Sequence, residues 1–116
     1  MNQKILWPVL SAVYFAAVCL SLFLPAVGIM NFPPGFDKLV HFGEFFLLVL
    51  LCLKDAELFF PKHKLLVYLL LFVLAISTEL IQLGIPHRSF DWLDFMADSF
   101  GITLGMIAYL IISWKR

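Results

Sequence analysis

Carboxylates and an imidazole recur at helical spacing in this 116-residue chain. The two sets are Asp37, His41 and Glu44, spaced i, i+4 and i+7, and Asp91, Asp94 and Asp98, spaced i, i+3 and i+7. Such spacings place each set on one face of a helix. Carboxylate and imidazole groups can accept hydrogen bonds from a ligand or coordinate a metal ion. The two faces are therefore candidate binding surfaces.

A third polar pair, Glu79 and Gln82 at i and i+3, comes just before Gly84 and Pro86. We expect Glu44, Glu79 and Asp98 to lie one to three helical turns below the membrane surface and to converge if their helices pack together. Unpaired buried carboxylates repel one another, so a nearby cation is needed. Arg88 is the expected neutralising residue in this shared site.

The elements that carry these residues are membrane helices. Hydrophobic residues make up 63% of the chain, charged residues 14%, and the mean hydropathy is +1.00, far above the near-half apolar content of a soluble domain. A spanning helix needs about 20 residues. Apolar runs cover residues 5–30, 39–53, 65–83 and 100–114. We predict an all-α integral membrane bundle of four transmembrane helices, in which the polar segments 37–44 and 90–99 form the first turns of the two shorter runs.

The first run could instead be a cleaved signal peptide, but it is longer than the usual apolar core of about 7 to 15 residues, which favours a helix. Ser89 is the expected N-cap of the last helix. Cys19 and Cys52 lie in apolar segments, so we expect no disulfide between them. The whole chain, residues 1–116, is predicted to be one domain.

Lysine and arginine predict the orientation of the bundle. With the N-terminus in the cytoplasm, Lys38 and Arg88 are external and six cations are cytoplasmic, as the positive-inside rule expects. The six are Lys4, Lys54, Lys62, Lys64, Lys115 and Arg116. Both termini are then cytoplasmic, and most acidic residues gather at the outer face as a partly buried pocket.

Each polar residue also has a simpler interpretation. Asp37, Lys38 and Asp91 can be solvated residues at helix ends, whereas deeper ionisable groups mark either a functional site or a structural clasp between helices. His41 lies a turn above Glu44 and can donate to that carboxylate. A metal role for His41 or for the loop residue His87 is the minor alternative. Gly101 and Gly105 form a GxxxG pattern, which favours close packing of a neighbouring helix.

The segment DKLVHFGEFFLL, from Asp37, and residues 78–105, TELIQLGIPHRSFDWLDFMADSFGITLG, resemble the VanZ-like family of small bacterial membrane proteins. The pattern falls within residues 36–113. Two residues depart from it: Phe45 stands where tyrosine is frequent, and His87 where glycine is common. The resemblance gives weight to Asp37, Lys38, His41, Glu44, Glu79, Gln82, Pro86, Arg88, Asp94, Asp98, Gly101 and Gly105.

The resemblance implies a multi-pass protein of the bacterial cytoplasmic membrane, and the namesake of the family is associated with resistance to the glycopeptide teicoplanin. The favoured hypothesis is an outer pocket that binds an amphiphilic envelope ligand, lipid-linked or glycopeptide. Lys38 and Arg88 would meet an anionic head group, and the carboxylates would accept its hydroxyl, amine or amide donors. The expected ligand-binding residues are Asp37, Lys38, His41, Glu44, Glu79, Gln82, Arg88, Asp94 and Asp98.

The alternative is a metal-dependent hydrolase or transferase that acts on a lipid-linked substrate. Glu44, Glu79, Asp94 and Asp98 would then be metal ligands, with His41 as the base. The favoured hypothesis assigns no catalytic residue, metal or cofactor. A net charge of zero gives no basis for nucleic-acid binding. The ligand and the oligomeric state stay open.

Overall fold

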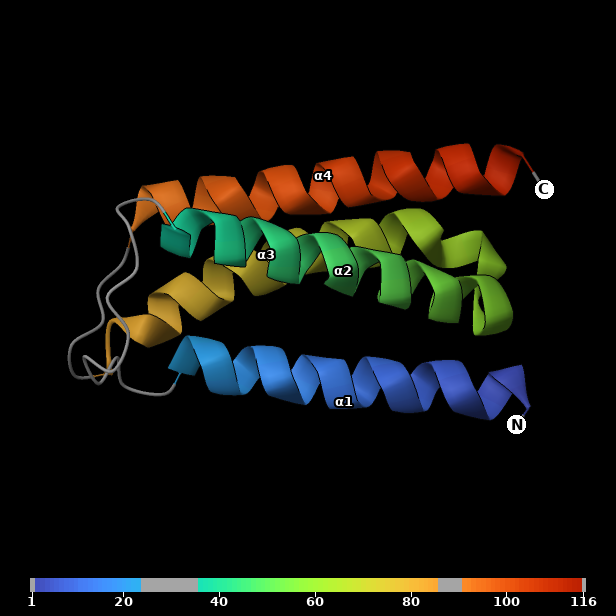
Figure 1. The fold of residues 1–116 in the computed structure, drawn as a ribbon, viewed down its shortest axis with the longest axis horizontal. Helices are drawn as coiled ribbons and strands as arrows, with labels where there is room; N and C mark the ends of the chain where they lie inside the picture. Colours follow the sequence, from blue (N-terminus) through green and yellow to red (C-terminus); the bar gives the residue numbers. More distant parts are fainter. Residues whose placement is uncertain (1, 24–35, 86–90, 116) are drawn as a thin grey trace.

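The computed structural model describes residues 2–23, 36–85 and 91–115, which form helices and connecting turns. The α-helices are α1 (Gln3–Phe23), α2 (Phe36–Phe59), α3 (Lys64–Gln82) and α4 (Trp92–Trp114), and a short 3-10 helix, η1 (Pro61–His63), joins α2 to α3 (Figure 1). The described residues contain no strand, which confirms the all-α prediction. Both shorter apolar runs extend toward their N-termini as predicted, to Phe36 and Trp92.

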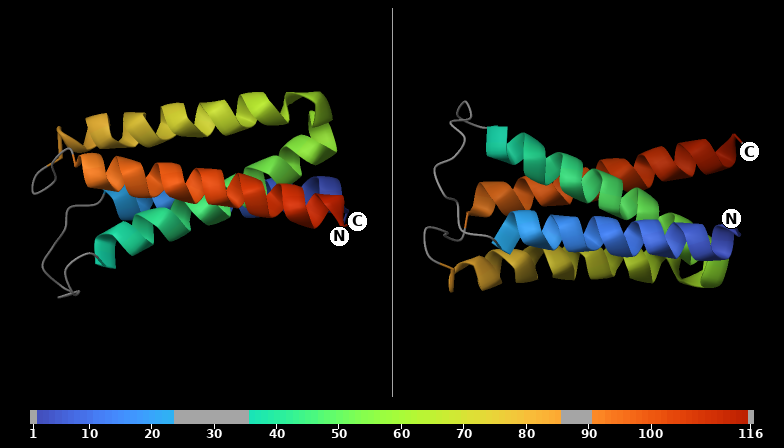
Figure 2. Two further views of the ribbon diagram at one scale, coloured as in Figure 1. Left: turned by 90° about the horizontal axis from the view of Figure 1, so that it is seen from above. Right: turned by 60° about the horizontal axis from the view of Figure 1, so that its bottom comes forward.

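The helices run back and forth, so the N- and C-termini lie at the same end of the bundle (Figure 1). In Figure 2, α2 crosses α4 obliquely in both views. Among the described residues, α2 packs against each of the other three helices, whereas α1 and α4 do not approach each other closely. Helix α2 is therefore the central element of the bundle.

Two glycines allow α2 and α4 to pack at short range. A Cβ atom at Gly101 would overlap the carbonyl oxygen of Phe42 and lie 3.1 Å from the backbone nitrogen of Phe46. A Cβ at Gly105 would overlap Val49 and lie 2.9 Å from the carbonyl oxygen of Phe46. The prediction that the GxxxG pattern packs against a neighbouring helix is confirmed, and that helix is α2.

Three segments of the described chain are long and apolar enough to cross a membrane, namely Gln3–Ser21, Pro61–Gln82 and Trp92–Trp114. Helix α2 has 24 residues, or about 36 Å at 1.5 Å per residue, but it carries charged residues near both ends. Large apolar side chains are exposed on the outside of the bundle, whereas Glu79 and Asp98 are fully buried inside it. This distribution is expected for helices surrounded by lipid.

Two smaller predictions concern single residues. Cys19 and Cys52 are free thiols, as predicted. Helix α4 begins at Trp92 with Asp91 as its N-cap, so the prediction of Ser89 as the cap is wrong. The carboxylate of Asp91 accepts a hydrogen bond from the backbone N–H of Leu93 at 2.9 Å, which is the usual bond of an N-cap side chain.

Candidate functional site

A group of ionisable side chains lies at the end of the bundle opposite the chain termini. Its members come from α2, from α3 and from the first turns of α4 and its cap. We call this group the polar cluster. It consists of Asp37, Lys38, His41, Glu79, Asp91, Asp94 and Asp98.

Lys38 joins α2 to the start of α4. Its ammonium lies 2.6 Å from the carboxylate of Asp91, 2.6 Å from that of Asp94 and 2.8 Å from that of Asp37. An ammonium has three N–H donors, and these three carboxylates can accept all of them. In this arrangement Lys38 is a counter-ion within the protein and does not face an external anion.

His41 lies between two aspartates of α4 and is only 6% exposed. Its Nδ1 is 2.9 Å from Oδ1 of Asp98, and its Nε2 is 3.6 Å from Oδ2 of Asp94. The expectation that His41 donates to Glu44 is wrong, because its ring faces α4. His41 and Lys38 thus tie the same face of α2 to α4.

Two buried carboxylate oxygens of the polar cluster lack a hydrogen-bond partner among the described residues. They are Oε1 of Glu79 and Oδ2 of Asp98, on side chains that are both 0% exposed. The other oxygen of Glu79, Oε2, accepts the backbone N–H of Asp91 at 3.4 Å. Burial of an unsatisfied carboxylate oxygen is costly. A hydrogen-bond donor, a bound proton or a cation at these two atoms would therefore stabilise the site.

The same residues offer a set of metal ligands. One donor atom each from His41, Glu79 and Asp98 lies within 4.8 Å of the others. The carboxylates of Asp37, Asp91 and Asp94 form a second such group, which Lys38 already bonds. Only the first group includes buried oxygens without a partner among the described residues.

The charges of the polar cluster do not balance among the described residues. Lys38 and, when protonated, His41 supply its positive charge. Its carboxylates are those of Asp37, Glu79, Asp91, Asp94 and Asp98. The cluster is thus suited to bind a donor-rich or cationic group. Arg88, the expected neutralising residue, lies outside the described residues, so its place in the site stays a prediction.

Glu44 lies at the boundary between α1 and α2. Its carboxylate accepts a hydrogen bond from the hydroxyl of Ser21 at 2.5 Å, and its backbone oxygen accepts one from the hydroxyl of Tyr14 at 2.8 Å. The structure therefore brings Glu79 and Asp98 together with His41 but points the carboxylate of Glu44 toward α1. Sequence reasoning missed Tyr14 and Ser21, although their seven-residue spacing places both on one face of α1.

Gln82, the other predicted site residue of α3, is 2% exposed and lies in the last turn of that helix, three residues after Glu79. Gln82 is therefore buried within the bundle, and its role as a ligand-binding residue stays a prediction.

We expect Asp91 to contribute to acid sensitivity. The side-chain hydrogen bond from Lys38 holds the pKa of Asp91 below its ordinary value. A lowered folded-state pKa contributes stability above the unfolded-state pKa of about 4, and that contribution is lost as the pH falls through the folded-state pKa. Asp91→Asn keeps an N-cap side chain but removes the charge. Its thermal midpoint in detergent should be lower than that of the wild type at neutral pH and should change less on acidification. Parallel pH profiles would contradict this account.

Helices that are long and apolar enough to cross a membrane, with ionisable side chains buried between them, are typical of a membrane protein. The chain belongs to the VanZ-like family, since the family model described as VanZ/LLP1 matches residues 3–113. No curated protein sequence and no solved structure matches the chain.

Proposed function

We propose that the protein binds the head group of an amphiphilic ligand of the bacterial envelope at the polar cluster. The observation that carries this proposal is the pair of buried oxygens, Oε1 of Glu79 and Oδ2 of Asp98, without a partner among the described residues. A head group with hydroxyl, amine or amide donors would satisfy them. Charge-assisted hydrogen bonds of this kind are stronger than those between neutral groups.

The two simpler interpretations of these residues fit less well. Solvated helix ends do not account for Glu79, His41 and Asp98, because these side chains are 0%, 6% and 0% exposed. A purely structural clasp does not account for the two buried oxygens that have no partner among the described residues. With Lys38 engaged by aspartates, Arg88 is the residue we assign to an anionic part of the head group.

We further propose that the polar cluster faces the outer leaflet and that both termini are cytoplasmic. The support is the distribution of lysines: Lys54, Lys62, Lys64 and Lys115 lie toward the end of the bundle that holds the termini. An outward-facing site would meet lipid-linked envelope precursors or glycopeptides. A contribution to teicoplanin resistance would follow from binding such a ligand.

Cysteine labelling tests this orientation. In a background with Cys19→Ala and Cys52→Ala, a cysteine in place of Lys62 should react with a membrane-impermeant maleimide only after the cells are permeabilised. A cysteine in place of His87 should react in intact cells. The reverse pattern would contradict the proposed topology and place the polar cluster inside.

Ligand retention tests the proposed function. Native mass spectrometry of the full chain should show phosphatidylethanolamine, which carries amine donors, retained over phosphatidylcholine, which has none. Glu79→Gln preserves the shape of the side chain. Because the amide oxygen of the glutamine would accept the N–H of Asp91, its N–H₂ group would point toward the site in place of Oε1. Retention should be abolished in Glu79→Gln. It should be weaker and less dependent on pH in His41→Asn, because imidazole titrates near neutral pH.

Asp55→Asn is the control, because Asp55 is an acidic residue of α2 at the opposite end of the bundle. It should retain phosphatidylethanolamine like the wild type. Equal retention by Glu79→Gln and Asp55→Asn, with both variants folded by circular dichroism, would refute binding at the polar cluster.

A second candidate function is a metal-dependent hydrolase or transferase that acts on a lipid-linked substrate. It is favoured by the convergence of His41, Glu79 and Asp98 within 4.8 Å, a mixed nitrogen and oxygen donor set of the kind that binds divalent transition metals. Glu44, which the sequence also suggested as a ligand, is bonded to Ser21 of α1. Elemental analysis separates the candidates: one equivalent of metal after purification without added metal, lost in His41→Asn, would favour the enzyme.

A further inference from the structure

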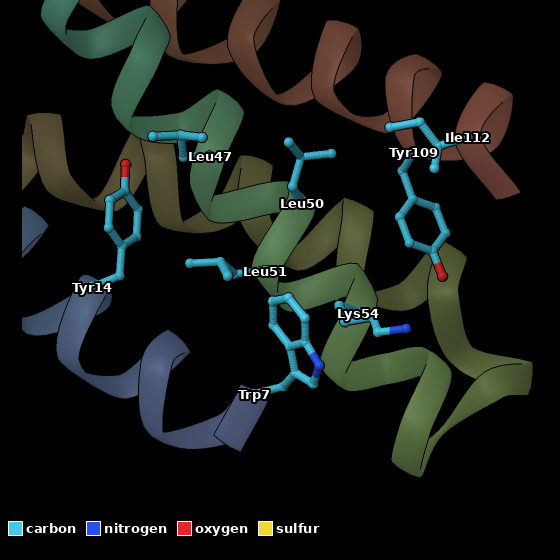
Figure 3. A pocket seen from close by; sticks show the side chains of 8 residues that line it. All are labelled: Trp7, Tyr14, Leu47, Leu50, Leu51, Lys54, Tyr109 and Ile112. Atoms are coloured by element: carbon cyan, nitrogen blue, oxygen red, sulfur yellow. The ribbon is translucent and has the colours of Figure 1, made fainter. Parts of the chain in front are cut away.

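An apolar groove opens on the bundle at the end that holds the chain termini, away from the polar cluster. Its cavity measures about 500 Å³. Leu47, Leu50 and Leu51 of α2 form its floor, and Trp7 of α1 and Tyr109 of α4 stand on either side (Figure 3). A volume of this size falls within the usual range of small-ligand sites.

The groove follows from the helix arrangement. Helices α1 and α4 both pack on α2 but do not approach each other closely among the described residues. A strip of α2 between them is left uncovered. Leu47, Leu51 and Lys54 lie along this strip at i, i+4 and i+7, a distance of about 10 Å along the helix axis. The result is an apolar groove along α2 that ends at the ammonium of Lys54.

The Lys54 end of the groove carries groups that suit an anion. The ammonium of Lys54 lies 5.9 Å from the ring centroid of Trp7. The nearest carboxylate oxygen among the described residues, of Glu57, is 3.7 Å away, which is too long for a hydrogen bond. The indole N–H of Trp7 has no acceptor among the described residues. An anionic oxygen beside Lys54 would supply that acceptor and pair with the ammonium.

We propose that this groove binds one acyl chain of an anionic membrane phospholipid, with its phosphate beside Lys54 and Trp7. The apolar floor suits the acyl chain. Lys54 is the one charged residue among the described residues that line the groove, so the groove does not suit a polar peptide. Charge complementarity selects the head group: Lys54 lines the groove, and Lys64 lies 5.4 Å from the ring centroid of Tyr109. Basic residues near a membrane surface attract anionic lipids.

This site is separate from the polar cluster and does not depend on the proposed function. None of the described residues that line the groove belongs to the polar cluster, and Tyr14 donates to the backbone oxygen of Glu44, which also lies outside that cluster. Substitutions at the Lys54 end therefore test the groove alone. Glu79→Gln should leave lipid binding in the groove unchanged.

The test uses the full chain, delipidated in detergent and mixed with vesicles of phosphatidylglycerol or phosphatidylcholine, with bound lipid counted by native mass spectrometry. Wild-type protein should retain phosphatidylglycerol several-fold better than phosphatidylcholine. Lys54→Gln should lose this preference. Lys62→Gln, at a lysine outside the groove, should keep it.

A second pair of variants tests the place of the acyl chain. Leu51→Trp fills the groove and should reduce phosphatidylglycerol retention several-fold. Leu66→Trp adds the same bulk on the exposed surface of α3, where Leu66 is 52% exposed, and should retain phosphatidylglycerol like the wild type. Equal retention of both lipids by the wild type, or full retention by Leu51→Trp, would overturn the proposal. So would a dimer that Leu51→Trp dissociates, because the occupant would then be a second copy of the chain.

Discussion

Replacing Gly101 with alanine should force α2 away from α4 and destabilise the fold by up to about 2 kcal/mol. The new Cβ would overlap the carbonyl oxygen of Phe42 and lie 3.1 Å from the backbone nitrogen of Phe46. Both atoms belong to the backbone of α2, so neither can move without shifting that helix. The strain of overpacking, about 1–3 kcal/mol, exceeds the gain of about 1 kcal/mol from replacing glycine by alanine in a helix.

Gly43→Ala is the matched control, because a Cβ at Gly43 meets no atom within 4 Å. This variant keeps the gain in helix propensity without the overlap, so it should be as stable as the wild type or more stable. Thermal unfolding in detergent, followed by circular dichroism, compares the two. If Gly101→Ala melts at the same temperature as Gly43→Ala, the short approach between α2 and α4 is not needed for the fold.

Replacing Lys38 with methionine should destabilise the protein by roughly 2 kcal/mol. This value lies between the cost of breaking an exposed ion pair and that of breaking a buried one, because the Lys38 side chain is 28% exposed. The substitution removes the ammonium that bonds Asp37, Asp91 and Asp94. Asp94 should contribute most, because its side chain is 12% exposed, whereas that of Asp37 is 60% exposed. The three carboxylates would then repel one another at the start of α4.

A double variant separates the loss of charge from the loss of packing. Adding Asp94→Asn to Lys38→Met removes one of the repelling charges and should restore part of the thermal midpoint. Lys62→Met, at an exposed lysine of η1, should leave the midpoint unchanged. A Lys38→Met midpoint equal to that of Lys62→Met would show that Lys38 is a solvated residue at a helix end, as its position in the sequence also allowed.

The helices could be predicted from the sequence, because hydropathy and length determine where apolar segments lie. The polar first turns of α2 and α4 were also predictable, since the apolar runs alone are too short to span a membrane. The convergence of Glu79 and Asp98 followed from their similar depth. The packing of α4 through Gly101 followed from residue size.

The partners within the site could not be predicted in the same way. His41 and Glu44 are three residues apart, which turns their side chains about 60° from each other around the helix. Periodicity gives that angle but not the position of the neighbouring helices. In the structure His41 faces α4 and Glu44 faces α1. The groove depends on α1 and α4 remaining apart, a property of packing that no single segment encodes.

The central claim is that Glu79 and Asp98 bind a ligand head group. The most direct test is an experimental structure of the full chain extracted together with its native lipids. The account predicts head-group density within about 3 Å, hydrogen-bond distance, of Oε1 of Glu79 and Oδ2 of Asp98. A structure in which protein side chains alone donate hydrogen bonds to both oxygens, with no head group at the polar cluster, would contradict it.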